Sequence, residues 1–312
     1  MPSYTATQIF QWLYQKKVFD PDLFSNVKAA YRDLLKCKFV CTFPNITSHK
    51  RSQDGSEKVL LENGCEMVIM PYEKRTTLCL SSQVGCRMGC TFCQTGKMGL
   101  MKNLKTHEIV EELLLAEKLI DKRITNVVFM GMGEPLDNYH AVKKAVHIFY
   151  DKKGLAIKPS KITISTCGII PQIEMMAKEL PVRLAISLHS ADTETRTKLM
   201  PISRKYPLAD LKKMLLKYPK DRYGITFEYL LIEGVNDSVQ DAKKLVQYVH
   251  GLKARVNLIP LLPSKNFSYN APSEPKIRAF ANYLREHGIV APVRYSRGAD
   301  ISGGCGQLSL DT

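Results

Sequence analysis

Three cysteines stand close together in the run CRMGCTFC at residues 86–93, as Cys86, Cys90 and Cys93. The spacing CxxxCxxC allows three thiolates to hold a 4Fe-4S cluster. Four thiolates would close the cluster and leave it an electron carrier, whereas three leave one iron open to a further ligand, as in open metal sites generally. The triplet therefore predicts a cluster that binds a small molecule at its free iron.

A zinc site or incidental cysteines are the alternatives. Zinc sites usually pair CxxC with a second CxxC or an HxxxH, and this chain has no second CxxC. The triplet resembles that of the radical S-adenosylmethionine (SAM) superfamily. That resemblance implies that the free iron binds the amino and carboxylate groups of SAM, and that an electron then cleaves SAM to give a 5'-deoxyadenosyl radical.

From residue 76 onward, apolar strand patterns alternate with amphipathic helix patterns, which predicts parallel strands joined by crossover helices. We expect an α/β fold with a partial (β/α)6 barrel, whose functional residues lie where the strands end. Expected strand cores after 76–80 are 127–129, 162–164, 184–186, 225–229, 256–259 and 293–295. Expected helices are 107–119, 139–150, 172–178, 208–217, 238–252 and 274–287.

The preceding chain predicts two smaller parts. Residues 1–45 contain two amphipathic helix patterns, at 5–17 and 25–36, and form a small helical appendage. Residues 46–75 contain short apolar runs separated by Asp54-Gly55 and Gly64, which favours a β-hairpin or meander leading into the barrel. The expected division is therefore 1–45, 46–75 and 76–312, with the barrel in the last part.

The chain has 45 Lys and Arg against 30 Asp and Glu, a formal charge of +15. This excess favours a polyanionic partner, nucleic acid first, over a generally basic surface. The nine cysteines do not indicate a disulfide scaffold, because the chain opens without an apolar signal segment and has no membrane-length apolar stretch. We expect a cytoplasmic, reduced protein with no membrane contact. Four cysteines without chemical context are expected to be buried and inert: Cys37, Cys41, Cys65 and Cys167.

Polar residues follow several expected strands. Gly133 and Glu134 lie in GMGEP at 131–135, where the glutamate could accept from the ammonium of SAM. Ser165 follows one strand, and the run of Ser187, Leu188 and His189 follows the next. We expect these residues to bind SAM, although His189 could instead only orient its loop.

Five segments together resemble the RlmN/Cfr family of radical SAM RNA adenine methyltransferases, over nearly the whole chain. They are 77–86 (TLCLSSQVGC), 131–135 (GMGEP), 187–189 (SLH), 234–237 (GVND) and 305–308 (CGQL). The resemblance implies that Cys305 accepts a methyl group from one SAM, that a second SAM supplies the radical, and that the resulting methylene group adds to an adenine carbon. It also implies that Cys79 resolves the covalent adduct through a transient disulfide with Cys305, and that Glu66 is the general base.

Two features depart from the family pattern. The family has an Asn that contacts SAM shortly after the NLIP run, and Leu262 occupies that position here. The N-terminal region is also shorter than is usual for the family, so part of the RNA-docking appendage is expected to be absent. Pro135 resembles the branch that methylates carbon 2 rather than the carbon-8 branch.

The expected function is thus methylation of carbon 2 of an adenosine in 23S ribosomal RNA, with tRNA as a second substrate. The resemblance further implies an electron donor such as flavodoxin or ferredoxin, and we expect a monomer. Three alternatives remain: a carbon-8 methyltransferase, a radical SAM activase that forms a glycyl radical, and an Fe-S protein that only binds RNA. Neither of the last two needs a methyl-carrying or resolving cysteine.

Overall fold

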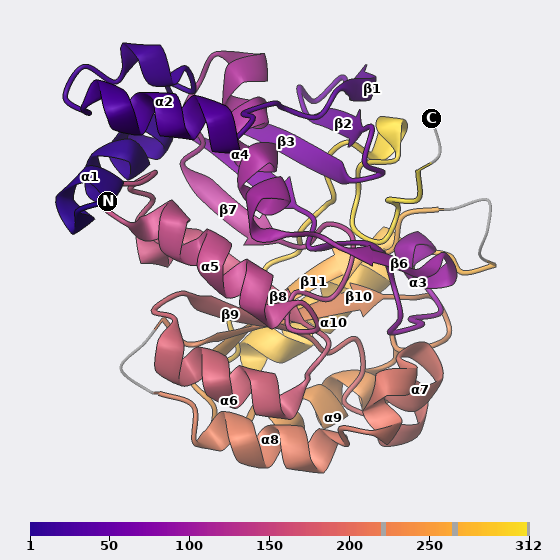
Figure 1. The fold of residues 1–312 in the computed structure, drawn as a ribbon. Coiled ribbons are helices and arrows are strands. Elements are labelled where there is room, and N and C mark those ends of the chain that lie inside the picture. The colour runs from indigo at the N-terminus through magenta and orange to yellow at the C-terminus, as the bar shows by residue number, and fades with distance from the viewer. Residues whose placement is uncertain (220–222, 264–267, 311–312) are drawn as a thin grey trace.

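The computed structural model describes residues 1–219, 223–263 and 268–310. Its centre is one curved, nine-stranded sheet in the order β1-β2-β3-β4-β7-β8-β9-β10-β11, with helices along its outer side (Figure 1). The first four strands are antiparallel and the others run parallel from β4 onward. The parallel half confirms the strand and helix alternation predicted from the sequence.

The strands of the large sheet are β1 (Ile46–Arg51), β2 (Glu57–Leu61), β3 (Glu66–Tyr72), β4 (Arg75–Leu80), β7 (Asn126–Phe129), β8 (Ile162–Thr166), β9 (Arg183–Ser187), β10 (Ile225–Leu231) and β11 (Ala254–Pro260). A two-stranded sheet pairs β5 (Gln83–Cys86) with β6 (Gly99–Asn103). The helices that follow barrel strands are α4 (Thr106–Ile120), α5 (Tyr139–Tyr150), α6 (Ile170–Glu179), α7 (Thr193–Leu199), α8 (Leu208–Leu216), α9 (Val239–Val249) and α10 (Glu274–Glu286). The sequence patterns missed α7, a short helix made almost entirely of polar residues.

Strand register divides the side chains of the sheet between two faces, because successive residues of a strand point to opposite sides. Phe227 and Tyr229 of β10 pack against Tyr248 of α9 and Phe280 of α10, so they belong to the outer face. Glu228 lies between them and therefore faces the inside of the barrel. Direct pairing from strand to strand places further polar or reactive side chains on this inner face: Cys79, Thr163, Ser165, Ser187 and Asn257.

The N-terminal residues form α1 (Ser3–Phe10), one π-helical turn (Gln11–Gln15), a short 3-10 turn (Pro21–Leu23) and α2 (Ala29–Lys38). The predicted helix at 5–17 is therefore interrupted, and the second helix begins at residue 29 rather than 25. Phe24 is buried and stacks on Trp12 with ring centroids 5.3 Å apart. This small apolar cluster is separate from the barrel core.

The last described residues run from the β11 edge of the sheet to the β1–β2 turn. The predicted strand at 293–295 is wrong, since Val293 makes only one isolated bridge, to Leu258. Farther along, Gly298 N donates to Asp54 Oδ2 at 2.9 Å, and Ser52 Oγ donates to Asp300. The C-terminal segment thus runs from the β11 edge to the β1–β2 turn (Figure 1), and isolated backbone and side-chain hydrogen bonds hold it rather than a regular strand.

Candidate active site

The three-cysteine loop connects β5 to α3 (Gln94–Lys97). Cys86 is the last residue of β5, and Cys93 is the residue just before α3. Gly96 allows the loop to close tightly, because a Cβ there would lie 3.2 Å from both the backbone N and O of Cys90. The sequence therefore folds this segment back on itself and brings the three thiols close enough to affect one another electrostatically.

The sulfur environment fits a bound metal cluster. Burial raises the pKa of Cys86 to about 12, and burial together with the nearby Cys93 and Cys86 sulfurs raises the pKa of Cys90 well above its usual range. Buried thiols of this kind stay protonated unless a metal takes them as thiolates.

The C-terminal loop that carries Cys305 docks directly on this cysteine loop. Gln94 N donates to Gly306 O at 2.8 Å, and Thr95 Oγ1 donates to Leu308 O at 2.7 Å. A Cβ on Gly306 would lie 3.2 Å from Phe92 O, so a glycine is suited to this close approach. Cys305 itself remains exposed. Two loops more than 200 residues apart in the sequence therefore form one structure.

Cys79 and Cys305 come close enough to affect each other electrostatically. Cys79 lies on β4, on the inner face of the barrel, and burial followed by the influence of Cys305 raises its pKa to about 12. Cys305 keeps an accessible surface but is densely surrounded by protein atoms, and the resulting desolvation raises its pKa to about 12, with Cys93 and Glu228 as the charged neighbours. Both cysteines are free thiols. Cys305 therefore lies near Cys79, Cys93 and Glu228.

Glu66 is fully buried at the start of β3, although a glutamate read from its strand pattern alone would ordinarily be solvated. Its Oε1 lies 2.7 Å from Lys58 Nζ, a close charge contact without hydrogen-bond alignment, and its Oε2 accepts from Ser309 N at 2.9 Å. The Lys58 side chain is only 5% exposed. The carboxylate is therefore bound both by a buried cation and by the segment that follows Cys305.

Glu134 lies in a buried turn after β7. Gly133 has φ +94°, a backbone conformation that favours glycine, and a Cβ there would collide with the Gln83 side chain. The Glu134 oxygens accept from Leu136 N at 3.0 Å and from Cys167 N at 2.8 Å. Burial raises the pKa of this carboxyl group. Its charge acts on Cys86 and Cys90, which places it next to the cysteine loop.

The other predicted SAM residues lie near the ends of β8 and β9. Ser165 and Ser187 both face the barrel interior, whereas Leu188 is fully buried. His189 has φ +55°, an uncommon value for a residue other than glycine, and its ring stands edge-on to Phe92 with centroids 4.8 Å apart. Its Nδ1 accepts from Leu230 N at 3.0 Å. Burial lowers its pKa to about 3, so the imidazole is neutral and its Nε2 carries the proton.

Leu262, at the position of the family's Asn, lies against the Cys305 loop. A Cβ on Gly304 would collide with Leu262 Cδ1, and Gln307 Nε2 donates to Pro263 O at 3.3 Å. The leucine therefore makes an apolar contact with the segment that carries Cys305.

Arg196 of α7 is a buried residue that sequence reasoning missed. It is 1% exposed and donates to the carbonyl oxygens of Leu188 at 3.0 Å and Cys167 at 2.7 Å, and also to Ser187 O and Ser203 Oγ. Its charge also acts on Cys90 and His189. The guanidinium thus joins the loops after β8 and β9. An arginine in a short, polar helix gave no sequence signal for this role.

A radical SAM superfamily model matches residues 80–246. The dual-specificity RNA methyltransferase RlmN of a Nitratiruptor species is 43% identical, over 98% of this chain and 93% of its own length. The RlmN of Campylobacter hominis is 42% identical, over 98% and 92%. This chain belongs to the RlmN family. A crystal structure of a radical SAM methyltransferase from Sphaerobacter thermophilus superposes with a TM-score of 0.91 and 39% identity, covering 100% of this chain and 94% of that one.

Membership of the RlmN family confirms the α/β radical SAM fold and implies a 4Fe-4S cluster and SAM. The residues present fit that pair of groups: three convergent thiols, a buried carboxylate beside them and a neutral histidine with one N–H to donate. Of the four cysteines expected to be inert, Cys65 and Cys167 are buried, whereas the expectation is wrong for the exposed Cys37 and Cys41. No described helix is long and apolar enough to cross a membrane.

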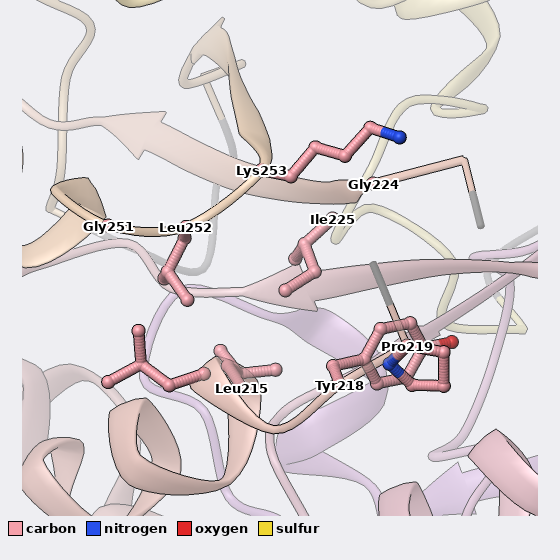
Figure 2. A pocket seen from close by; sticks show the side chains of 9 residues that line it. Leu215, Tyr218, Pro219, Gly224, Ile225, Gly251, Leu252 and Lys253 are labelled. Atoms are coloured by element: carbon pink, nitrogen blue, oxygen red, sulfur yellow. The ribbon is translucent and has the colours of Figure 1, made fainter. Parts of the chain in front are cut away.

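Two surface pockets lie away from the RlmN site. Figure 2 shows a small one with Leu215, Tyr218 and Ile225 on its walls. Ile225 begins β10, so this pocket is at the end of the barrel opposite the cysteine loop. The second lies between the N-terminal region and α4, where Lys17 pairs with Glu117 at 2.5 Å. Neither contains a predicted site residue.

Arg196→Lys is expected to destabilise the protein, because an ammonium cannot reproduce the planar fork of donors. Losing two hydrogen bonds of a charged donor costs about 3 kcal/mol or more, which corresponds to a fall in the thermal unfolding midpoint of roughly 5–10 °C. Circular dichroism measures that midpoint. Arg204→Lys, the same change at an exposed position, is the matched control, and equal midpoints for the two variants would contradict the assigned role.

Proposed function

We propose that this chain methylates carbon 2 of an adenosine in 23S ribosomal RNA, with tRNA as a second substrate, and uses two SAM molecules per turnover. The observation that carries the proposal is the approach of Cys305 to Cys79 and to the cysteine loop, from segments far apart in the sequence. A protein that only bound RNA, or one that made a glycyl radical, would need neither thiol.

In this proposal the bound cluster and SAM supply the methyl group and the one-electron chemistry that activates it. Cys305 accepts the methyl group on Sγ and presents its carbon to the adenine. Glu66 takes the proton from the adenine carbon, and Cys79 attacks Cys305 to release the product as a disulfide forms. Cys86, Cys90 and Cys93 would hold the cluster. The residues that would bind SAM are Gly133, Glu134, Ser165, Ser187, Leu188 and His189, and Leu262 takes the place of the family's polar contact.

The same proposal covers the RNA substrate, the electron donor and the division into domains. The formal charge of +15 suits an RNA substrate. The chain acts as a cytoplasmic monomer and takes its electrons from a flavodoxin or ferredoxin. Residues 1–45 and 46–75 form the RNA-side appendage and the lead-in to a barrel at 76–312.

Anaerobically reconstituted protein is expected to bind one 4Fe-4S cluster and to produce 2-methyladenosine in a 23S ribosomal RNA fragment. Iron analysis and mass spectrometry of nuclease-digested RNA check the two parts. Cys90→Ala is expected to lose the cluster and all product, whereas Cys37→Ala, at an exposed cysteine, keeps both. Methylation at carbon 8, or product from the Cys90→Ala protein, would refute the proposal.

A further inference from the structure

Glu228 is a buried carboxyl group inside the barrel that none of the proposed roles uses. It is 7% exposed and faces the interior, because its neighbours Phe227 and Tyr229 pack outward against α9 and α10. In the sheet it stands directly between Ser187 of β9 and Asn257 of β11. A charged residue within the largely apolar run ITFEYLL at 225–231 is the sequence signal that could have found it.

Glu228 and Asn257 form a pair with unused hydrogen-bonding capacity. Asn257 Nδ2 donates to Glu228 Oε1 at 3.0 Å. Asn257 Oδ1 is buried and accepts no hydrogen bond from the described residues. Burial raises the pKa of Glu228 to about 7, with Asn257 and Arg294 acting in the opposite direction. A buried, unpartnered polar atom is costly, so this pair is built for a ligand that supplies the missing partner.

Adenine has the complementary edge. Its 6-amino group donates two hydrogens and its N1 accepts one. Asn side chains commonly pair with adenine through the 6-amino group and a neighbouring ring nitrogen, N7 in the DNA major groove, and N1 offers the same acceptor chemistry on the other side of that amino group. A carboxyl group that is partly protonated near neutral pH can accept from the 6-amino group or donate to N1. Enzymes that modify a base commonly bind it in a pocket and read its Watson–Crick edge.

The position of the pair relative to Cys305 favours the same ligand. Glu228 is close enough to Cys305 for its charge to act on that thiol. Carbon 2 of adenine is bonded directly to N1, so a side-chain pair that holds the N1 and 6-amino edge also keeps carbon 2 next to the bound edge. Glu228 and Asn257 can therefore present that carbon to a group on Cys305.

We propose that Glu228 and Asn257 bind the N1 and 6-amino edge of an adenine inside the barrel. If that adenine belongs to the target adenosine of the RNA, the inference rests on the proposed function. SAM carries the same base, and its adenosine is the other possible source. Both sources present the same N1 and 6-amino edge, so the experiment has one arm for the RNA and one for SAM.

The reconstituted holoenzyme is tested for binding, which does not require turnover. In one arm, the ligand is an RNA hairpin with a single loop adenosine, compared with the same hairpin carrying purine riboside, which lacks the 6-amino group. In the other arm, SAM is compared with its analogue that lacks the 6-amino group. Wild-type protein is expected to prefer the amino-bearing ligand by about 10-fold to 100-fold in one arm, the worth of one good base-edge contact.

Glu228→Leu is expected to lose that preference, whereas Glu228→Gln, which keeps donor and acceptor groups, is expected to retain most of it. Glu233→Gln, at an exposed position after β10, is the matched control. Loss of preference in the RNA arm assigns the pair to the target adenosine, and loss in the SAM arm assigns it to the cofactor. Two results would overturn the proposal. One is a wild-type preference below about 3-fold in both arms, which is too small for one base-edge contact. The other is a wild-type preference that Glu228→Leu leaves intact.

Two further measurements separate a folding defect from loss of recognition. Iron content and the midpoint of thermal unfolding show whether Glu228→Leu is folded, and Asn257→Ala tests the same preference from the other side of the pair. Failure of the proposed function is a different result, namely wild-type protein that makes no methylated RNA. That result leaves the SAM arm able to support or overturn the inference.

Discussion

Cys79→Ala protein is expected to carry RNA joined covalently through Cys305, and Cys305→Ala protein is expected to carry none. With Cys305 present, its sulfur can accept the methyl group and become linked to the adenine through one carbon. Release requires the Cys79 thiolate to attack the Cys305 sulfur, so that an S–S bond forms while the C–S bond breaks. The electron pair of that bond stays with the carbon, which takes up a proton and becomes the methyl group. Without Cys79 the reaction stops before this step.

The observable is a protein band of reduced mobility that nuclease treatment collapses. Cys79→Ala is expected to show it in most of the purified protein, and the Cys79→Ala/Cys305→Ala double variant is expected to lack it. Cys65→Ala serves as the control, because Cys65 is also buried near β3 but has no assigned role. Identical behaviour of the two single variants would show that the methyl-carrier chemistry does not apply to this chain.

Lys58→Met is expected to destabilise the protein by about 3–5 kcal/mol, because it leaves Glu66 as a buried charge without its partner. The ammonium and the carboxylate are 2.7 Å apart and both are nearly inaccessible to solvent. A fall in the midpoint of thermal unfolding measures the effect. Lys74→Met, the same change at an exposed lysine on the β3–β4 turn, is the control.

A double variant separates stability from chemistry. Lys58→Met/Glu66→Leu removes both charges and is expected to recover most of the lost stability, since apolar residues often replace a buried ion pair without cost. It is nevertheless expected to form no 2-methyladenosine, because the proposed general base, Glu66, is missing. A double variant as unstable as Lys58→Met would show that the ion pair does not explain the single-variant loss, and RNA methylation by the double variant would exclude Glu66 as the base.

Local sequence patterns predicted much of the barrel. The helix expected at 139–150 coincides with α5, and the strands expected around 162–164, 184–186 and 225–229 lie within β8, β9 and β10. These elements are encoded by the spacing of apolar residues over a few turns or pleats. The same patterns failed at 293–295. Backbone hydrogen bonds from Leu258 N to Pro292 O and from Arg294 N to Leu258 O form one isolated parallel bridge there, and Pro292 has no N–H with which to extend the pairing.

The candidate site was only partly accessible from the sequence. The spacing of Cys86, Cys90 and Cys93 within one short loop is a local property, so it indicated a cluster directly. The approach of Cys305 to Cys79 followed only from the family resemblance. Arg196 and Lys58 gave no signal, because a single Arg or Lys in a polar segment is usually exposed, whereas here both are buried by elements distant in the sequence.

The sequence by itself thus determined the alternation of strands and helices, the cysteine triplet and the family. The tertiary structure alone decided which residues share the barrel interior: it sets Glu228 beside Asn257, ties Glu66 to Lys58 and Ser309, and docks the Cys305 loop on the cysteine loop. The physical reason is the distance along the sequence between the residues that interact. Secondary structure depends on neighbours a few residues apart, whereas these pairings depend on strand register and on contacts across up to 243 residues.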